Sequence, residues 1–172
     1  AMQAQEKKKA DVPTPVKTLL RDARAAIKNN RDQAKNESNL QKALSRTDLT
    51  MEERAEIRYT QSLLNLSMND AENVKAYLKQ KYDTASFFNT LLKASQYALM
   101  CDSADIAPNE KGKVKPRFRE KNRAVLLTYR PNIYAGGRFY LRKNDFKAAL
   151  PFFTLYIDML DEPLLKDNVS LL

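Results

Sequence analysis

The chain has 172 residues, with 30 lysines and arginines against 21 acidic residues and a formal net charge of +9. It contains no histidine and one cysteine, Cys101. These counts exclude Ser-His and Cys-His nucleophiles, His-bound zinc and an internal disulfide. The three glycines, Gly112, Gly136 and Gly137, form neither of the usual glycine-rich nucleotide-binding motifs. The composition therefore favours a non-catalytic single domain or a short repeat array.

The first predicted helix begins at Thr14-Pro15, where threonine is a good N-cap and proline a good first-turn residue. An apolar stripe at helical spacing follows it: Val16, Leu19, Leu20, Ala23 and Ile27. Asn29-Asn30 interrupts this stripe, and a second helix continues to about Ser45. Residues 14–45 are therefore predicted to form one antiparallel helix pair.

A capping box, Thr50 to Glu53, predicts the start of a third helix that ends near Ser67. Asn69-Asp70 then predicts a turn into a short fourth helix. Three apolar residues of this fourth helix are expected to face inward: Val74, Tyr77 and Leu78. Residues 50–80 would be the second pair.

Asp83 is the predicted cap of a fifth helix, which carries the strongest apolar face in the chain: Phe87, Phe88, Leu91, Leu92, Ala98 and Leu99. Residues 103–116 contain two prolines and a glycine and predict a long loop. A sixth helix follows at about 117–130. Pro131 is expected to separate it from a seventh at about 132–143, and an eighth runs from Asp145 to about Leu160. The prediction is an all-α protein of about eight helices, with residues 83–130 and 131–161 as the third and fourth pairs.

One segment of the last pair combines large, small and turn residues at fixed spacing: Ile133, Gly137, Tyr140, Asp145, Phe146, Ala149 and Phe153. This pattern resembles the tetratricopeptide repeat, a helix-turn-helix unit of 34 residues. The resemblance implies that residues 13–163 form a right-handed superhelix of stacked antiparallel pairs. Weaker copies of the pattern surround Asp32 and Asp70.

The same resemblance assigns packing roles within this segment. Gly137 and Ala149 would let the two helices approach closely, while Tyr140, Phe146 and Phe153 would fill the space around their crossing. Two departures from the family are Tyr156, where a small residue is usual, and Pro163, which comes two residues late. Other interpretations of the local sequence are a break or hinge at Gly136-Gly137 and a kink at Pro151.

The resemblance also implies a function, because such arrays bind peptides or partner proteins in an extended groove. Tyr134, Arg138 and Arg142 share one helix face at i, i+4 and i+8 and are the candidate groove residues. Some members of the family bind the C-terminal carboxylate of a peptide with a lysine and an asparagine on the first helix of a repeat. This sequence has Tyr134 and Arg138 at the equivalent positions, so that carboxylate site is not matched. An ordinary solvated helix face is the alternative interpretation.

A basic stretch is the second candidate site. Eight basic residues lie between Glu110 and Arg130, against Glu110 and Glu120. Seven of them form the candidate anion-binding patch: Lys111, Lys113, Lys115, Arg117, Arg119, Lys121 and Arg123. Only Phe118 is interleaved among these seven, so the stretch lacks the stacking residues of a nucleic-acid platform. The alternatives are thus a polyanion-binding module, with nucleic acid disfavoured, or a solvated loop and helix start.

No cofactor or metal is expected. Asp102, Asp105 and Glu110 lie near the predicted long loop but do not match a calcium-loop pattern, and helix capping accounts for them better. Cys101 is expected to be a small core residue.

The two ends of the chain carry further expectations. Residues 1–12 are predicted to be a disordered tail, and Gln3-Ala4-Gln5 followed by lysines resembles the start of an exported mature protein of Gram-negative bacteria. That resemblance implies a periplasmic or envelope location, with the cytoplasm as the alternative. No apolar run reaches the roughly 18 residues that span a membrane. Residues 164–172 are interpreted as a tail or as the start of a further repeat.

Overall fold

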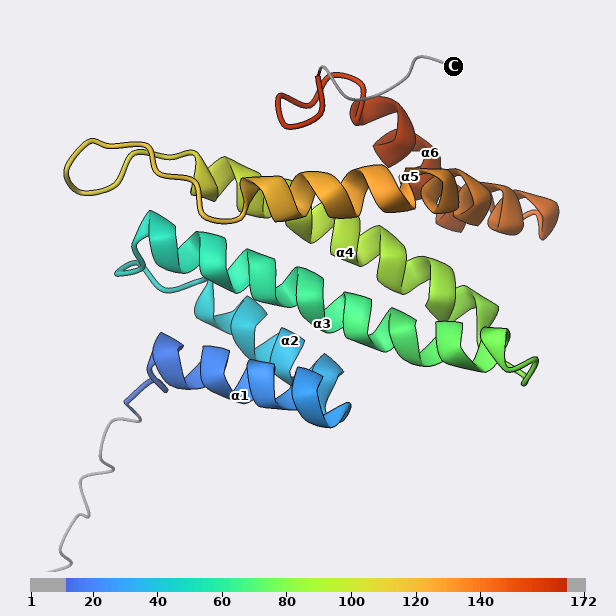
Figure 1. Ribbon diagram of the computed structural model, residues 1–172, viewed down its shortest axis with the longest axis horizontal. Coiled ribbons are helices and arrows are strands. Elements are labelled where there is room, and N and C mark those ends of the chain that lie inside the picture. The colour runs from blue at the N-terminus through green and yellow to red at the C-terminus, as the bar shows by residue number, and fades with distance from the viewer. Residues whose placement is uncertain (1–11, 167–172) are drawn as a thin grey trace, which may run out of the picture.

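The computed structural model describes residues 12–166, which form six helices and no strand. The helices are α1 (Val16–Asn29), α2 (Gln33–Ala43), α3 (Met51–Tyr77), α4 (Thr84–Asp105), α5 (Arg119–Arg142) and α6 (Phe146–Asp158). Consecutive helices run in opposite directions and form three pairs, α1–α2, α3–α4 and α5–α6 (Figure 1). The predicted all-α class is confirmed.

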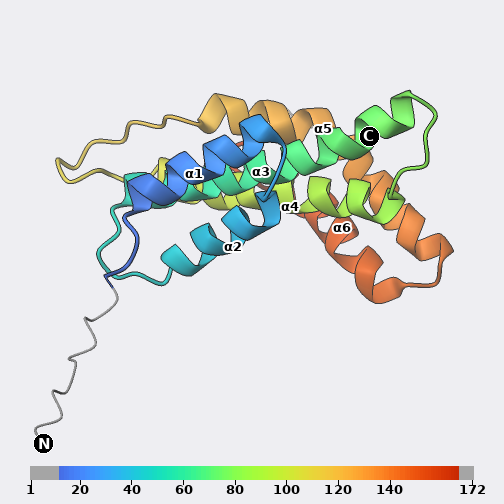
Figure 2. The same ribbon diagram turned by 90° about the horizontal axis from the view of Figure 1, so that it is seen from below.

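The long α3–α4 pair forms the centre of the molecule. Both α1 and α2 pack on α3, while α5 packs on α4. Figure 1 shows α1 and α2 on one side of this centre and α5 and α6 on the other, and in the view from below α2 and α6 lie toward opposite ends of it (Figure 2). The three pairs are therefore stacked in chain order.

Three helix starts have side-chain caps at predicted positions. Thr50 Oγ1 accepts a hydrogen bond from Glu53 N at 3.0 Å, and the Glu53 carboxylate accepts one from Thr50 N at 3.1 Å. Asp83 and Asp145 cap α4 and α6 by accepting from backbone N–H groups three residues later. Each cap satisfies an amide that the first helical turn leaves free.

The described residues hold six helices where eight were expected, because two predicted breaks do not occur. The first lies at Asn69-Asp70, which is inside α3. Asn69 is buried, and its side-chain amide donates to the carbonyl of Phe87 on α4 at 2.9 Å. This contact between helices outweighs the turn preference of the dipeptide. The inward orientation predicted for the following apolar residues is wrong, since all three are exposed: Val74, Tyr77 and Leu78.

The second expected break is at Pro131, which α5 passes through. Pro131 is on the exposed side of the helix, whereas Leu126 and Ile133 are fully buried on the other side. Continuous burial of that face keeps the two halves of α5 in one helix despite the lost backbone hydrogen bond. The predicted pairs 83–130 and 131–161 are therefore wrong. Instead, α4 pairs with α3, and α5 pairs with α6.

The apolar core consists of two clusters. One joins α1, α2 and α3 around Leu20, Leu40 and Ile57. The other joins α4, α5 and α6 around Leu126 and Phe152, and it includes Leu164 and Leu165. Residues 164–166, interpreted from sequence as a tail or a new repeat, thus include two side chains of this core. The predicted tail at residues 1–12 lies outside the described residues except for Val12, and residues 167–172 lie outside them as well.

Gly136 and Gly137 are both within α5, where the helix meets α6. A Cβ at Gly136 would clash with the ring of Phe152, and one at Gly137 would lie 2.8 Å from the ring of Phe153. The pair therefore serves close helix approach, and the predicted alternative of a helix break there is wrong, since α5 is continuous through both glycines. Ile133, Tyr140 and Ala149 are buried at this crossing, as expected.

Phe146 is the exception among the packing residues. It was expected to fill the helix crossing, but it is exposed. As the first residue of α6, it lies on the outer face of that helix, which it shares with Leu150 and Ile157.

Candidate protein-binding surface

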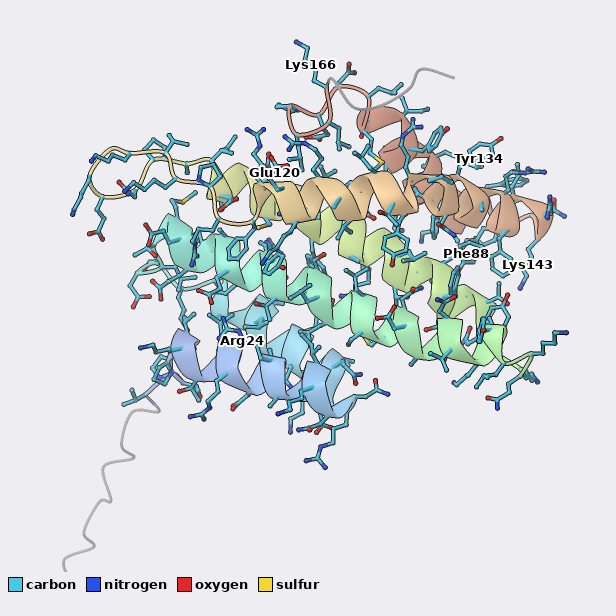
Figure 3. All side chains as sticks on the ribbon, in the orientation of Figure 1. Arg24, Phe88, Glu120, Tyr134, Lys143 and Lys166 are labelled. Carbon is cyan, nitrogen blue, oxygen red and sulfur yellow. The ribbon has the colours of Figure 1, made fainter. Side chains whose placement is uncertain are left out.

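The structure places Tyr134, Arg138 and Arg142 along one exposed side of α5. All three come from the part of α5 that packs on α6. Tyr134 lies over the stretch where α5 and α6 overlap, toward the same end of the helix as Lys143 (Figure 3). Helical spacing alone brings the three side chains together.

Tyr134 is part of an aromatic cluster that spans α5 and α6. Its ring centroid lies 5.8 Å from that of Phe153 and 5.2 Å from that of Tyr156. The Arg138 guanidinium lies 5.9 Å from the Tyr134 ring, within the range of a cation–π contact. The Tyr134 side chain is fixed by this packing and is still 43% exposed. A rigid, half-exposed tyrosine is a favourable anchor for a binding partner.

Arg130 holds the far side of this cluster. Its guanidinium lies 3.7 Å from the Tyr156 ring centroid, and one of its terminal nitrogens donates to the Tyr156 carbonyl at 3.0 Å. Both contacts of the Arg130 side chain are therefore to Tyr156 on α6, and they stabilise the packing of α6 on α5. By contrast, no acidic side chain within residues 12–166 lies at ion-pair distance from Arg138 or Arg142. Those two cations are available to a partner.

The structure divides the seven residues of the candidate anion-binding patch. Lys111, Lys113 and Lys115 are exposed on the loop between α4 and α5. The three arginines make internal contacts: Arg117 donates to the Glu52 carbonyl, Arg119 pairs with Asp102, and Arg123 donates to the Leu164 carbonyl. The patch is not gathered on one surface.

The seventh residue, Lys121, belongs to a stacked cluster that the sequence pattern does not reveal. Its ammonium lies 5.9 Å from the Tyr59 ring, which stacks on Phe118 with centroids 4.2 Å apart. Arg117 lies 4.7 Å from the Phe118 ring. These contacts dock the start of α5 on α3.

A cleft of about 740 Å³ separates residues 47–52 from residues 107–115. Its charged lining residues are Asp48, Glu52, Glu110, Lys111 and Lys115. Three carboxylates and two lysines line it, so the cleft is not predominantly positive. Lys111 and Lys115 thus face a mixed environment rather than a positive groove.

The acidic residues near the loop have structural roles. The Asp105 carboxylate accepts from the amides of Arg117 and Phe118 at 2.8 and 2.9 Å. Burial raises the pKa of Asp102, an effect that Arg119 opposes. Cys101 is buried, its thiol lies 3.2 Å from the Ala55 carbonyl, and burial raises its pKa to about 12. Within residues 12–166 no cluster of acidic or cysteine side chains could hold a metal ion.

Four large apolar side chains of α5 and α6 are also exposed. Leu141, next to Arg142, and three residues on the outer face of α6 are large, apolar and exposed: Phe146, Leu150 and Ile157. The three α6 residues recur at i, i+4 and i+11, so their shared face was visible in the sequence. The resemblance instead predicted that Phe146 packs between the helices, so Phe146 was not grouped with Leu150 and Ile157 as an exposed face.

None of the described helices is both long enough and apolar enough to cross a lipid bilayer. Comparison with family models, with curated proteins and with solved structures gives no significant match to the chain. The candidate surface therefore rests on the contacts, exposure and charge described above.

Proposed function

We propose that this protein is a non-enzymatic scaffold that binds a segment of another protein on the exposed side of α5 and α6. The observation that carries the proposal is the cluster of Tyr134, Arg138 and Arg142. It combines a fixed aromatic anchor with two cations that make no ion pair within residues 12–166. Tyrosine and arginine are the residue types that most often dominate protein interfaces.

The stacking of three helix pairs agrees with this function. Stacked pairs present extended surfaces on which several turns of helix contact one partner. The tetratricopeptide-like pattern at 133–153 supports the same proposal, as does the lack of histidine for acid–base catalysis. The resemblance of the N-terminal sequence to exported proteins suggests that binding takes place in the periplasm or at the envelope.

A polyanion-binding function of the 111–123 stretch is the weaker alternative. It is favoured by the exposure of Lys111, Lys113 and Lys115. It is disfavoured by the internal contacts of Arg117, Arg119 and Arg123. Nucleic-acid affinity falls by about 10³–10⁵ between 50 and 200 mM salt when six to ten phosphates are contacted, whereas peptide binding on α5–α6 should change much less.

Selection from an unconstrained random-peptide display library tests the proposed function. We expect enriched peptides to lose binding to the Arg138→Glu/Arg142→Glu variant by about 10-fold or more. The Lys17→Glu/Arg21→Glu variant of α1 makes the same change of charge at a distant exposed face and should bind normally. Peptides that bind all three proteins equally would overturn the assignment of this surface.

A further inference from the structure

The outer face of α6 carries an apolar strip that nothing within residues 12–166 covers. We define the α6 strip as Phe146, Leu150 and Ile157, which are 64%, 65% and 61% exposed. At about 100° per residue, their spacing places all three within an arc of about 40°. Isolated exposed apolar residues are common, but an aligned set on one helix face marks an interaction surface.

The α6 strip continues onto α5. Phe153, one turn from Leu150, packs against Gly137 and the Tyr134 ring. Tyr134 and Leu141 are exposed beside it on α5. The apolar surface therefore crosses the seam between the two helices and joins the site proposed above.

The length of the strip suits a helical ligand. Eleven residue steps from Phe146 to Ile157 correspond to about 16 Å, or three helical turns. An amphipathic helix presents apolar residues at i, i+4, i+7 and i+11 over the same distance. Such a helix can bury its apolar face on the strip while its polar face stays in water.

Charge decides which helix fits. No acidic residue lies between Glu120 and Asp145, so the half of α5 that packs on α6 carries only positive charge. Arg138 and Arg142 edge the seam, and Lys147 lies on the exposed side of α6. Of the nearby acids, Asp145 is used in capping α6, and Asp158 is at its last turn. The rim is thus predominantly positive.

A second copy of the chain is a poor occupant, because a two-fold symmetric contact pairs the same surface of both copies and would bring two basic rims together on a protein of net charge +9. We propose that the α6 strip and its basic rim bind an acidic amphipathic helix of another protein. This inference rests on the proposed function and names the class of partner.

The test is a display library of helices about 20 residues long. Each has leucine at i, i+4, i+7 and i+11 and a random choice of Glu, Lys or Gln at the flanking positions. Selection on the wild-type protein should enrich Glu-rich members. Synthetic copies of these should bind about 10-fold or more weakly to both Leu150→Asp/Ile157→Asp and Arg138→Glu/Arg142→Glu. The control Lys17→Glu/Arg21→Glu should stay within about twofold of wild type.

Enrichment of Lys-rich helices, or of helices without charge preference, would overturn the inference. So would a dimer of the protein alone in sedimentation equilibrium that Leu150→Asp/Ile157→Asp abolishes, because the strip would then be a self-association surface. Circular dichroism of each variant checks that it remains helical. If random peptides depend on Arg138 and Arg142 but not on Leu150 and Ile157, the acidic-helix inference fails while the proposed function stands.

Discussion

The two ends of the helix stack differ in the side chains that they expose. On α1 and α2 no large apolar side chain is exposed, and the outward residues include Lys17, Arg21 and Lys28. On α5 and α6 five are exposed: Tyr134, Leu141, Phe146, Leu150 and Ile157. An end of a helix stack that faces water requires a polar outer face. The outer face of the first pair is polar, whereas the last pair exposes apolar side chains, as the proposed binding of a partner there would require.

The difference also extends to the interior. The cluster of α1–α3 consists of aliphatic side chains, whereas that of α4–α6 includes Phe152, whose ring lies against Gly136 and 5.7 Å from the Tyr140 ring. The last pair thus combines large rings with minimal side chains, and its stability depends on their close fit.

The largest expected effect comes from truncating one buried side chain in each of the two core clusters. Phe152→Ala should lower the free energy of unfolding by about 3–5 kcal/mol and Leu40→Ala by about 2–5 kcal/mol, because both side chains are fully buried. Urea denaturation measures these losses, and hydrogen exchange locates them. Phe152→Ala should speed exchange mainly in α5 and α6, and Leu40→Ala mainly in α1 and α2. Equal acceleration at both ends in either variant would show a single cooperative core.

A smaller effect is expected at the glycine contact. Gly136→Ala should lower the free energy of unfolding by up to about 2 kcal/mol. Overpacking against Phe152 destabilises the fold by about 1–3 kcal/mol, while the higher helix propensity of alanine stabilises it by about 1 kcal/mol. Ala135→Ser, at an exposed neighbouring position, is the control. Thermal denaturation provides the measurement, and a stabilised Gly136→Ala protein would contradict the close-approach interpretation.

Polar substitution of the α6 strip should leave stability almost unchanged. Leu150→Gln/Ile157→Gln removes exposed apolar area, so the free energy of unfolding should stay within about 0.5 kcal/mol of wild type. Binding of a hydrophobic fluorescent dye should fall. The matched change at the polar end, Lys17→Gln/Arg21→Gln, should not reduce dye binding. A loss of stability as large as that of a core substitution would mean that the strip is packed within the protein.

The smallest effect concerns pH. The pKa of Glu162 is raised, first by burial and then by Asp102 and Asp158. A carboxyl with a raised folded-state pKa stabilises the fold below its unfolded pKa of about 4.3, and that contribution is lost as the pH rises through the folded value. Urea denaturation from pH 4 to 7 should therefore show a smaller decline for Glu162→Gln than for wild type. Glu110→Gln, on the exposed loop, is the control, and identical profiles for all three proteins would contradict the prediction.

Features fixed by a few neighbouring residues were predictable from the sequence. The capping box at Thr50 and the cap at Asp83 depend on side chains and amides only three residues apart. Helical spacing likewise places Tyr134, Arg138 and Arg142 on one face without knowledge of the fold.

Features set by distant contacts were not predictable. Asn69 favours a turn locally, but its hydrogen bond to Phe87 across 18 positions keeps it inside α3. The neighbours of Tyr134 on α6, Phe153 and Tyr156, become part of the candidate site only after α5 and α6 pack together. The exposure of Phe146 also depends on how α6 turns relative to α5.

The carboxylate of Asp105 has a consequence for changes in chain length. It is the last residue of α4, and it binds the amides of Arg117 and Phe118 just before α5. This side chain ties the two ends of the intervening loop together, so the docking of α5 should depend little on how many residues the loop contains. Doubling the length of a flexible loop costs only about 0.6 kcal/mol. We therefore expect an epitope or a fluorescent label inserted at the exposed turn at Gly112 to leave the structure at both ends of the helix stack unchanged.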